Sequence, residues 1–530
     1  MTIDPFDLLG GTAPQPVPES VEPGPDGVLR ADIVIIGSGM GGSTLAHALR
    51  GSGARVLVVE RGDFLPREIQ NWSPEDVFAG GRYRNAESWL NAAGGTFSPG
   101  VHYYVGGNTK VYGAMLPRFR AEDFGVVDHP DGRSKAWPVS YAELEPYYAE
   151  AERLYRVHGA PGDPTDPWRS TDYPFPALAH DQPIADLAGA LSAQGLRPFV
   201  MPAAVDYQPD GRCVLCRTCD GFPCLVDAKG DADVFALRPA LASRSVGLLT
   251  RTFVERLVTS PDGGTVTEAH GRRDGRPVRI VADRFVVACG AANTAALLLR
   301  SADDQHPLGL ANSSDQVGRN YMVHNSTFFV AVDPRRRNTT RFQKTLALND
   351  WYLASPSTPF PLGNVQMLGK LQAPMLAGAR RGVPTGVLRY MTDHSVDLYL
   401  TSEDLPDPAN RITVRNGRIV VAWTPNNLGS HAQLVRRTTR AVRKAGYPLV
   451  FTERMGIATN SHMCGTAVMG EDPGSSVVDP TGKAHDLANL WIADSAVFPS
   501  SAAVNPALTI AAHALRLAAE SGLCPTPSGQ

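Results

Sequence analysis

The sequence contains 530 residues, of which 43% are hydrophobic and 19% are charged, and its formal net charge is −3. This balance is typical of a soluble globular enzyme, and it gives no electrostatic support for a nucleic-acid or anionic-membrane partner. On a prior of roughly 150 residues per domain, the length predicts two to four structural units.

The sequence shows no export or membrane signal. It has no run of eighteen apolar residues, and residues 1–20 lack the positive start and apolar core of a secretory signal. Seven cysteines, an odd number, argue against a disulfide framework. We therefore expect a cytoplasmic protein that binds neither membrane nor nucleic acid.

The N-terminal region predicts a tail followed by a strand, a helix and a second strand. Residues 1–29 are rich in proline, glycine and acidic residues without an apolar period, which indicates a tail or arm. The segment ADIVIIG predicts a buried strand, STLAHALRGSG a helix, and ARVLVVERG another buried strand. Residues 31–62 therefore predict a βαβ unit.

Later segments return to this pattern on both sides of a β-rich stretch. Ser140 and Glu143 form a capping-box pattern ahead of a helix, and residues 284–301 read as strand, turn and helix. Residues 326–452 are β-rich with one helix near 431–446, whereas the last seventy residues are strand and helix again. We predict an α/β fold in which a Rossmann-like nucleotide-binding domain is interrupted by an α+β domain built on an antiparallel sheet.

A glycine-rich turn lies between the first strand and the first helix. In GSGMGG, Gly37, Gly39 and Gly42 follow the G-x-G-x-x-G order, which permits a tight turn, close approach to a pyrophosphate and close helix–strand contact. Glu60 ends the second strand, where a carboxylate accepts hydrogen bonds from ribose hydroxyls and disfavours a 2′-phosphate. The pattern predicts a site for FAD or NAD and does not separate the two.

Four of the seven cysteines lie close together in CVLCRTCDGFPC, residues 213–224. Their C-x2-C-x2-C-x4-C spacing differs by one residue from a ferredoxin pattern and lacks its following proline. We favour a compact thiol-rich turn at a domain junction, with a zinc or iron–sulfur site and a disulfide as alternatives. The four are Cys213, Cys216, Cys219 and Cys224.

His462 and Asn505 are candidate catalytic residues near the C-terminus. An imidazole can act as a general base because its pKa lies near working pH. Structural interpretations also exist, since a lone histidine in a small-residue loop needs no function. The segment VNPA also reads as a helix start, with Asn505 at the N-cap and Pro506 at N1.

Four stretches, in chain order, resemble the glucose-methanol-choline (GMC) family of flavin oxidoreductases. They are DIVIIGSGMGGSTLAHALRGSGARVLVVERG, YYVGGNTKVYGAMLPRFRAEDF, WPVSYAELEPYYAEAE and the block from NSHMCG to ALRLA. The resemblance implies a discontinuous FAD-binding domain at residues 30–165, 225–325 and 453–525. It implies a substrate-binding domain, with the cysteine-rich junction, at residues 166–224 and 326–452.

The resemblance also implies the contacts of a non-covalent FAD. We assign no residue to a metal, since no H-x-x-x-H or H-E-x-x-H pattern occurs. The three motif glycines would face the pyrophosphate, and Glu60 and Arg61 would lie at the adenosine ribose. The other implied contacts are Gly106, Gly107, Asn108, Thr109, Val254, Asp494, Asn505 and Pro506. In fungal pyranose oxidases a histidine of the GG segment bonds covalently to the flavin, whereas this chain has Asn108, Thr109 and Lys110 there.

His462 and Asn505 fall on the family's paired catalytic positions, which implies His462 as the general base. The chain looks most like the bacterial pyranose-oxidase and glycoside 3-oxidase branch. That likeness implies oxidation of a secondary ring hydroxyl of a sugar or glycoside, at C2 or C3, to a ketone, with dioxygen as acceptor and hydrogen peroxide as product. The alternatives are an FAD dehydrogenase with another acceptor, using the cysteines as an electron relay, and a flavin-binding protein without redox turnover.

A long loop supplies a candidate substrate contact. Residues 348–370 combine aromatic residues, prolines and uncharged polar residues, as active-site lids often do. We select Gln366 as a hydroxyl contact, because the strand after this loop should face the flavin in the family's architecture. His324 fits a family segment near the domain junction, and we expect it to be structural. The sequence leaves the oligomeric state open.

Overall fold

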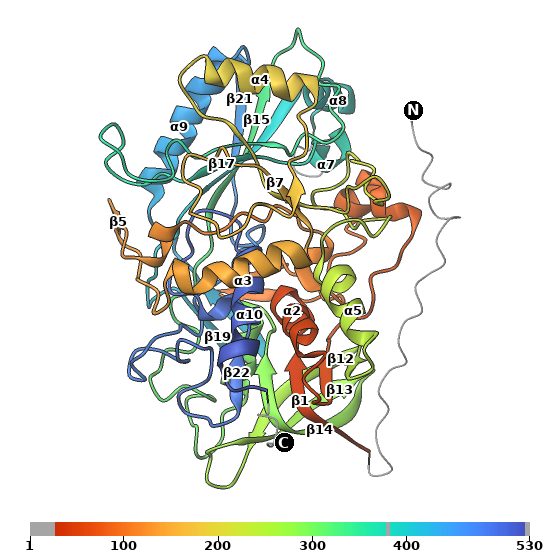
Figure 1. Ribbon diagram of the computed structural model, residues 1–530, viewed down its shortest axis with the longest axis vertical. Coiled ribbons are helices and arrows are strands. Elements are labelled where there is room, and N and C mark those ends of the chain that lie inside the picture. Colours follow the sequence, from red (N-terminus) through yellow and green to blue (C-terminus); the bar gives the residue numbers. More distant parts are fainter. Residues whose placement is uncertain (1–26, 378–381, 525–530) are drawn as a thin grey trace.

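The structure is a computed structural model that describes residues 27–377 and 382–524. Two sheets dominate it: a seven-stranded sheet in the lower half of Figure 1 and a six-stranded sheet in the upper half. None of the helices in the described ranges is long and apolar enough to cross a membrane. Residues 1–26 of the tail predicted at 1–29 lie outside the described residues, and the predicted end of the tail is wrong because Val28 and Leu29 already belong to the first strand.

The seven-stranded sheet has a parallel centre. Its strands are β1 (Val28–Ile36), β2 (Val56–Val59), β11 (Val246–Leu249), β12 (Thr252–Thr259), β13 (Val266–Arg273), β14 (Arg276–Val287) and β22 (Leu490–Ile492). Strand β1 pairs in parallel with β2 on one side and β14 on the other, and β22 adds to β14. The continuous valine and isoleucine runs of β1 and β2 suit strands that are covered on both faces.

Helices cover this sheet as the predicted βαβ unit requires. Helix α2 (Met40–Leu49) follows β1 directly, and α10 (Ala507–Glu520) packs against both α2 and α3 (Tyr141–Leu154). Figure 1 shows these three helices side by side across the middle of the molecule. The Rossmann-like arrangement predicted from the sequence is confirmed.

One predicted helix cap is confirmed and another is wrong. At α3, Ser140 Oγ accepts the Glu143 N–H at 3.3 Å and the Glu143 carboxylate accepts the Ser140 N–H at 2.7 Å, which confirms the predicted capping box. The predicted N-cap role of Asn505 is wrong: α10 begins at Ala507 without a side-chain cap. The Asn505 side chain is engaged instead by Gln366, which donates to its Oδ1 at 2.8 Å.

The second sheet is antiparallel, as predicted for the inserted domain. In order across the sheet its strands are β21 (Leu449–Arg454), β15 (Asn325–Val332), β18 (Ser395–Ser402), β17 (Asn364–Met367), β16 (Leu346–Leu348) and β9 (Phe199–Val200). Helix α9 (Leu428–Lys444), predicted near residues 431–446, packs on this sheet and contacts α4 (Gln182–Ser192). Apolar side chains of the two helices and the sheet form one buried cluster.

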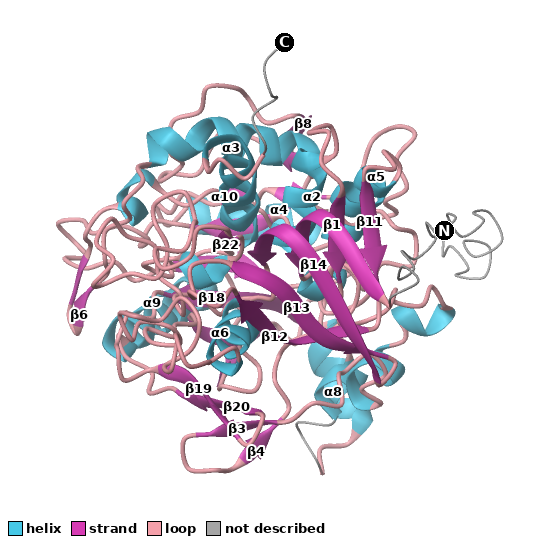
Figure 2. Ribbon diagram, turned by 90° about the horizontal axis from the view of Figure 1, so that it is seen from below, coloured by secondary structure: helices cyan, strands magenta, loops and turns pink. Residues whose placement is uncertain are grey.

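One β-rich segment leaves the sheet in which it was expected. Strands β19 (Arg411–Arg415) and β20 (Arg418–Ala422), in the predicted β-rich segment, form a hairpin. Strand β20 pairs with β3 (Trp89–Asn91), and β3 pairs with β4 (Thr96–Phe97). Figure 2 shows these four strands as a separate sheet. The partner strands lie more than three hundred residues earlier in the chain, so the local sequence pattern does not predict this pairing.

Smaller elements connect these layers. They are α5 (Arg238–Leu241), α6 (Ala291–Arg300), α7 (Ala373–Ala377), α8 (Thr385–Asp393), β5 (Asp128–His129), β6 (Gly132–Arg133), β7 (Val157–Gly159), β8 (Phe175–Pro176) and β10 (Ala203–Ala204). Helix α6 follows β14, as the strand, turn and helix pattern of residues 284–301 predicts.

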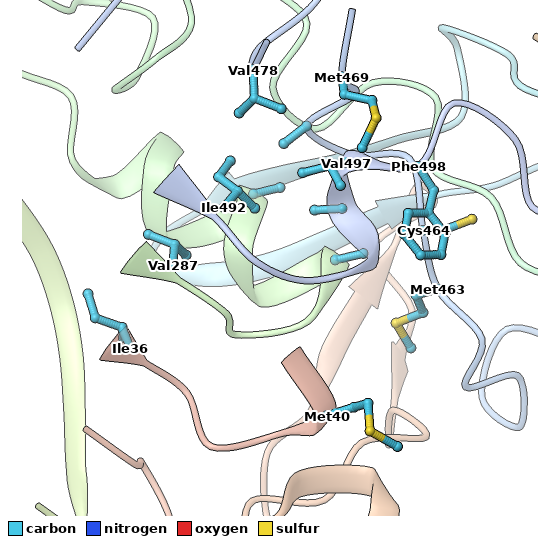
Figure 3. Packing of buried hydrophobic residues seen from close by; sticks show 14 of the residues in the cluster. Ile36, Met40, Val287, Met463, Cys464, Met469, Val478, Ile492, Val497 and Phe498 are labelled. Atoms are coloured by element: carbon cyan, nitrogen blue, oxygen red, sulfur yellow. The ribbon is translucent and has the colours of Figure 1, made fainter. Parts of the chain in front are cut away.

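A large buried cluster joins the C-terminal block to the ends of the parallel strands. Ile36, Val287 and Ile492 close three adjacent strands of the first sheet, and Met40 and Met463 lie in the same cluster (Figure 3). Burying these side chains stabilises the fold by about 25 cal/mol for each Å² of apolar surface removed from water. This packing brings the segment that carries His462 to the carboxyl ends of the strands.

Candidate active site

A cavity of about 480 Å³ lies at the carboxyl ends of the parallel strands. Its walls include the turn after β1, residues Val59–Arg61 after β2 and residues Ala288–Gly290 after β14. In open α/β sheets, ligands bind in this crevice because backbone N–H groups of the following turns and helices face it. The opposite wall is formed by strands of the second sheet, through Gln366 and Tyr399.

The cavity gathers most of the site residues predicted from the sequence. Its lining includes Gly37, Gly39, Glu60, Arg61, Gly107, Asn108, Thr109, Val254, Gln366, His462, Asp494, Asn505 and Pro506. Gly42 and Gly106 do not line it and lie directly behind the wall. Gly42 packs on the Gly37 carbonyl, and the Gly106 N–H donates to Ser38 Oγ at 3.1 Å.

The three motif glycines have different physical reasons to be glycine. Gly37 has φ +106°, and a Cβ there would lie 2.3 Å from the Ala288 carbonyl oxygen. A Cβ on Gly42 would lie 2.0 Å from the Gly37 carbonyl oxygen. A Cβ on Gly39 would meet no protein atom within 4 Å, so Gly39 keeps open a space at the N-terminus of α2. That space, rimmed by helix N–H groups, fits the pyrophosphate of a dinucleotide.

Glu60 and Arg61 are held by the protein at the end of β2. The Glu60 carboxylate accepts from Ser38 N at 3.1 Å, Ser38 Oγ at 2.6 Å and Gly62 N at 2.8 Å. Burial raises the pKa of Glu60 even though these donors oppose the shift. The Arg61 guanidinium lies over the Tyr103 ring, 4.0 Å from its centroid. Both residues border the part of the cavity next to Val254.

Asp494 ties the C-terminal block to the turn before α6. Its Oδ2 accepts from Gly290 N at 2.9 Å and from Thr294 Oγ1 at 2.5 Å, and its Oδ1 accepts from Ala496 N at 2.8 Å. Burial raises its pKa. The carboxylate therefore fixes two walls of the cavity relative to each other.

His462 is paired with His324, a residue that we expected to be structural. The two Nδ1 atoms are 3.0 Å apart, and His324 Nε2 lies 3.1 Å from the Ser501 carbonyl oxygen. A carbonyl oxygen only accepts, so His324 Nε2 carries the hydrogen and His324 Nδ1 carries a lone pair. That lone pair accepts the Nδ1–H of His462. His462 Nε2 is then unprotonated, makes no hydrogen bond to the residues that the structure describes, and faces the cavity that His462 lines.

Both imidazoles are neutral in this environment. Burial lowers the pKa of His462 to about 3, with a further lowering from His324 and an opposing effect of the Asp220 carboxylate. Burial lowers the pKa of His324 to about 4, against the Ser501 carbonyl. A neutral imidazole with a free Nε2 lone pair is the form that can accept a proton from a bound hydroxyl.

Asn505 presents a donor to the same cavity. Gln366 Nε2 donates to Asn505 Oδ1 at 2.8 Å, which orients the Asn505 amide so that its NH₂ group remains for a ligand. Gln366 lies on β17, so the selected substrate residue does reach the cavity. The site thus combines a proton acceptor with amide donors.

The structure adds cavity residues that the sequence did not identify. His102, Asp220, Phe328, Lys344 and Tyr399 also line it. Asp220 was visible only as part of the cysteine-rich segment, and the others carried no local signal. Their place in the cavity depends on contacts between segments more than one hundred residues apart.

Comparisons with known proteins agree with this geometry. Models described as GMC oxidoreductase match residues 104–326 and 402–514, and a model described as NAD(P)-binding Rossmann-like domain matches residues 35–115.

Proteins with similar sequences include two oxidases and the large subunit of a dehydrogenase. The 6'''-hydroxyparomomycin C oxidase of Streptomyces lividus is 31% identical over 97% of this chain and 96% of its own length. The paromamine 6'-oxidase of Streptomyces fradiae is 31% identical over 92% of this chain and 90% of its own length. The fructose dehydrogenase large subunit of Gluconobacter japonicus is 29% identical over 92% of this chain and 97% of its own length.

The solved structure of pyridoxine 4-oxidase from Mesorbium loti shares the fold, with a TM-score of 0.64 at 18% identity over 92% of this chain and 98% of its own. Family models together cover residues 35–326 and 402–514, and two relatives at 31% identity match 97% and 92% of the chain. The chain belongs to the GMC oxidoreductase family.

Proposed function

We propose that this chain is an FAD-dependent enzyme that oxidises a secondary ring hydroxyl of a sugar or glycoside, at C2 or C3, to a ketone. The single observation that carries the proposal is that the free Nε2 of His462, the Asn505 amide and the open space at Gly39 share one cavity. The relatives named for sugar derivatives support the substrate class.

One set of cavity residues would hold the cofactor and another would hold the substrate. The Gly39 turn would hold the pyrophosphate, and Glu60 and Val254 the adenosine end, while the 107–109 segment would lie along the flavin. When bound, FAD supplies the hydride acceptor. FAD is proposed to be non-covalent because the segment that carries the covalent histidine in fungal pyranose oxidases has Asn108, Thr109 and Lys110 here.

Proton transfer belongs to the protein. The substrate hydroxyl would donate to His462 Nε2 while the Asn505 NH₂ group donates to the same hydroxyl oxygen. The hydroxyl proton would go to His462, and bound FAD would supply the acceptor for the hydride from the carbon, which would leave a ketone. A positioned general base of this kind contributes on the order of 10² to 10⁴ in rate.

Dioxygen is the proposed electron acceptor, and hydrogen peroxide the proposed second product. A dehydrogenase that uses another acceptor is the second candidate, and the likeness to the fructose dehydrogenase large subunit favours it. Purified protein in air should form one peroxide per ketone. Turnover that requires an added dye acceptor would replace the oxidase proposal with the dehydrogenase.

A substrate panel tests the proposal as a whole. Free pyranoses, O-glycosides and C-glycosides are incubated with the FAD-loaded protein, and NMR of the product locates the carbonyl carbon. We expect a ketone at C2 or C3 of at least one ring. Oxidation confined to primary alcohols would reject the assignment of a secondary hydroxyl.

A further inference from the structure

The cysteine-rich segment contributes a carboxylate to the cavity. Asp220 and Gly221, from the middle of CVLCRTCDGFPC, line it together with Lys344, Gln366 and His462. Resting on the proposed function, we propose that Asp220 and Lys344 form a subsite that holds two neighbouring hydroxyl groups of an uncharged, polyhydroxylated ring.

Buried thiols hold the segment that carries Asp220. Cys219 belongs to a buried cluster with Met115 and Phe342, and Cys213 and Cys216 pack against that cluster. All seven cysteines are free within residues 27–377 and 382–524, and the same residues contain no group of three or more acidic, histidine or cysteine side chains placed to hold a metal. Burial raises the pKa of Cys216 to about 12, so the thiol is neutral and packs as a small apolar side chain.

Hydrogen bonds to backbone groups and to the carboxylate also hold the segment around Asp220 in place. The Gly221 N–H donates to the Val111 carbonyl at 2.9 Å, and the Lys229 ammonium donates to the Phe222 carbonyl at 2.7 Å. The Gly369 N–H, from the segment after β17, donates to Asp220 Oδ2 at 3.1 Å. The turn is therefore tied both to the flavin-side segment and to the second sheet.

Asp220 and Lys344 form an ion pair at the cavity wall. Lys344 Nζ lies 3.3 Å from Asp220 Oδ2 and also donates to the Gly113 carbonyl. The Lys344 side chain is 2% exposed and the Asp220 side chain 24% exposed, so the carboxylate is the more accessible member of the pair, and both residues line the cavity. Burial disfavours ionisation of Asp220, but Lys344 and the Gly369 N–H outweigh it and lower its pKa.

The rest of this part of the cavity is mostly apolar. The wall includes Met115, Phe328, Met367, Tyr399 and Met455. An ion pair on such a wall loses solvation, and further hydrogen bonds to a polar ligand would offset that cost. Its chemistry suits adjacent hydroxyl groups, because the carboxylate accepts from one O–H and the ammonium donates to the neighbouring oxygen.

The pair also selects by charge. Asp220 and Lys344 cancel, and His462 is neutral, so this end of the cavity carries no net charge to attract an amino sugar or a uronic acid. The Asp220 carboxylate opposes the lowering of the His462 pKa and adds to the raising of the Tyr399 pKa. Asp220 and His462 line the same cavity, so a ring held by Asp220 occupies the cavity that contains the proposed base.

The test compares a pyranoside with its monodeoxy and charged derivatives on the holoenzyme. The pyranoside with the highest kcat/KM in the substrate panel is used. Removing a hydroxyl that this pair holds should lower kcat/KM by about tenfold to a hundredfold, the usual effect of losing a hydrogen bond to a charged group. The corresponding amino sugar and uronic acid should be poorer substrates than the neutral sugar by at least about tenfold.

A double variant links that selectivity to the pair. In Asp220→Asn with Lys344→Gln, the parent sugar and the critical deoxy derivative should have kcat/KM values that agree within about twofold, with bound FAD retained. The exposed pair Asp128 and Arg133, changed in the same way, is the control and should keep the wild-type selectivity.

Failure of the subsite and failure of the proposed function give different results. If no pyranoside reduces the flavin of the wild-type enzyme, the proposed function fails. If pyranosides react but no deoxy derivative away from the oxidised carbon loses more than about twofold, the subsite is rejected on the wild-type enzyme alone. The subsite is also rejected if a folded double variant loses as much kcat/KM on removal of the hydroxyl as the wild-type enzyme does.

Discussion

At the scale of single residues, the hydrogen bonds of two buried histidines decide which imidazole nitrogen can take a proton. The Ser501 carbonyl fixes the hydrogen on His324 Nε2, and His324 in turn fixes the hydrogen on His462 Nδ1. His324 thus acts through His462 and is a positioning residue. Its own nitrogen atoms are both engaged, so it has no lone pair left for the substrate.

Replacing His324 tests this arrangement. His324→Ala should keep FAD bound and lower the rate of sugar-dependent flavin reduction on the order of tenfold, because the His462 tautomer is no longer fixed. The His324 ring lowers the pKa of His462, so its removal should raise that pKa and move the acid limb of the kcat/KM profile to higher pH.

A conservative change separates positioning from packing. His324→Asn keeps an acceptor oxygen close to the place of Nδ1 and should retain more of the rate than alanine does. Equal rates and superimposable pH profiles for wild type and His324→Ala would show that the pair has no part in proton transfer.

Sequence alone identified part of this site. His462, Asn505 and Gln366 were predicted, and all three line the cavity. The His324 contact was missed because it joins positions 138 residues apart, and no local pattern encodes such a contact. Asp220 was missed because its place in the cavity depends on contacts with Gly369 and Lys344, more than one hundred residues later in the chain.

At the scale of elements, the turn between β1 and α2 separates packing from ligand binding. Gly37 and Gly42 are glycine because neighbouring carbonyl oxygens leave no room for a Cβ, whereas Gly39 faces open space. The sequence motif predicted the turn, and the structure distinguishes the reasons for each glycine. The β19–β20 hairpin shows the limit of such patterns, since its strands were predictable and their partners were not.

Two alanine variants of the turn should behave differently. Gly39→Ala should fold with a thermal midpoint within about 2 °C of that of the wild-type apoprotein, but bind FAD at least about tenfold more weakly, because its Cβ occupies the pyrophosphate space. Gly37→Ala should lower the thermal midpoint of the apoprotein itself, because its Cβ would meet the Ala288 carbonyl. Tight FAD binding by Gly39→Ala would contradict the assignment of that space.

At the scale of the whole molecule, one cavity is built from both sheets. The seven-stranded sheet supplies the nucleotide turn and the six-stranded sheet supplies Gln366 and Tyr399. A ligand that fills this cavity contacts both layers, so its binding energy is linked to the folding of both. Hydrophobic patterns predicted that a Rossmann-like domain is interrupted by an antiparallel sheet. The orientation of the two sheets relative to each other depends on the buried cluster of the C-terminal block.

Removing FAD should therefore destabilise the molecule as a unit. Protein stripped of FAD should melt several degrees lower than holoprotein, because FAD at a hundredfold excess over its Kd contributes about 2.7 kcal/mol to the folded state. Flavin release followed by fluorescence and loss of helix followed by circular dichroism should share one midpoint. Flavin release well before any change in circular dichroism would contradict the linkage.

The most direct test of the central claim is anaerobic flavin reduction in His462→Ala. With saturating sugar, the variant should retain bound FAD and bleach it at least about a hundredfold more slowly than wild type, as expected for loss of the general base. His270→Ala is the control, since His270 lies on β13 outside the cavity and should leave the rate unchanged. Bleaching of His462→Ala at the wild-type rate would show that His462 is not the base.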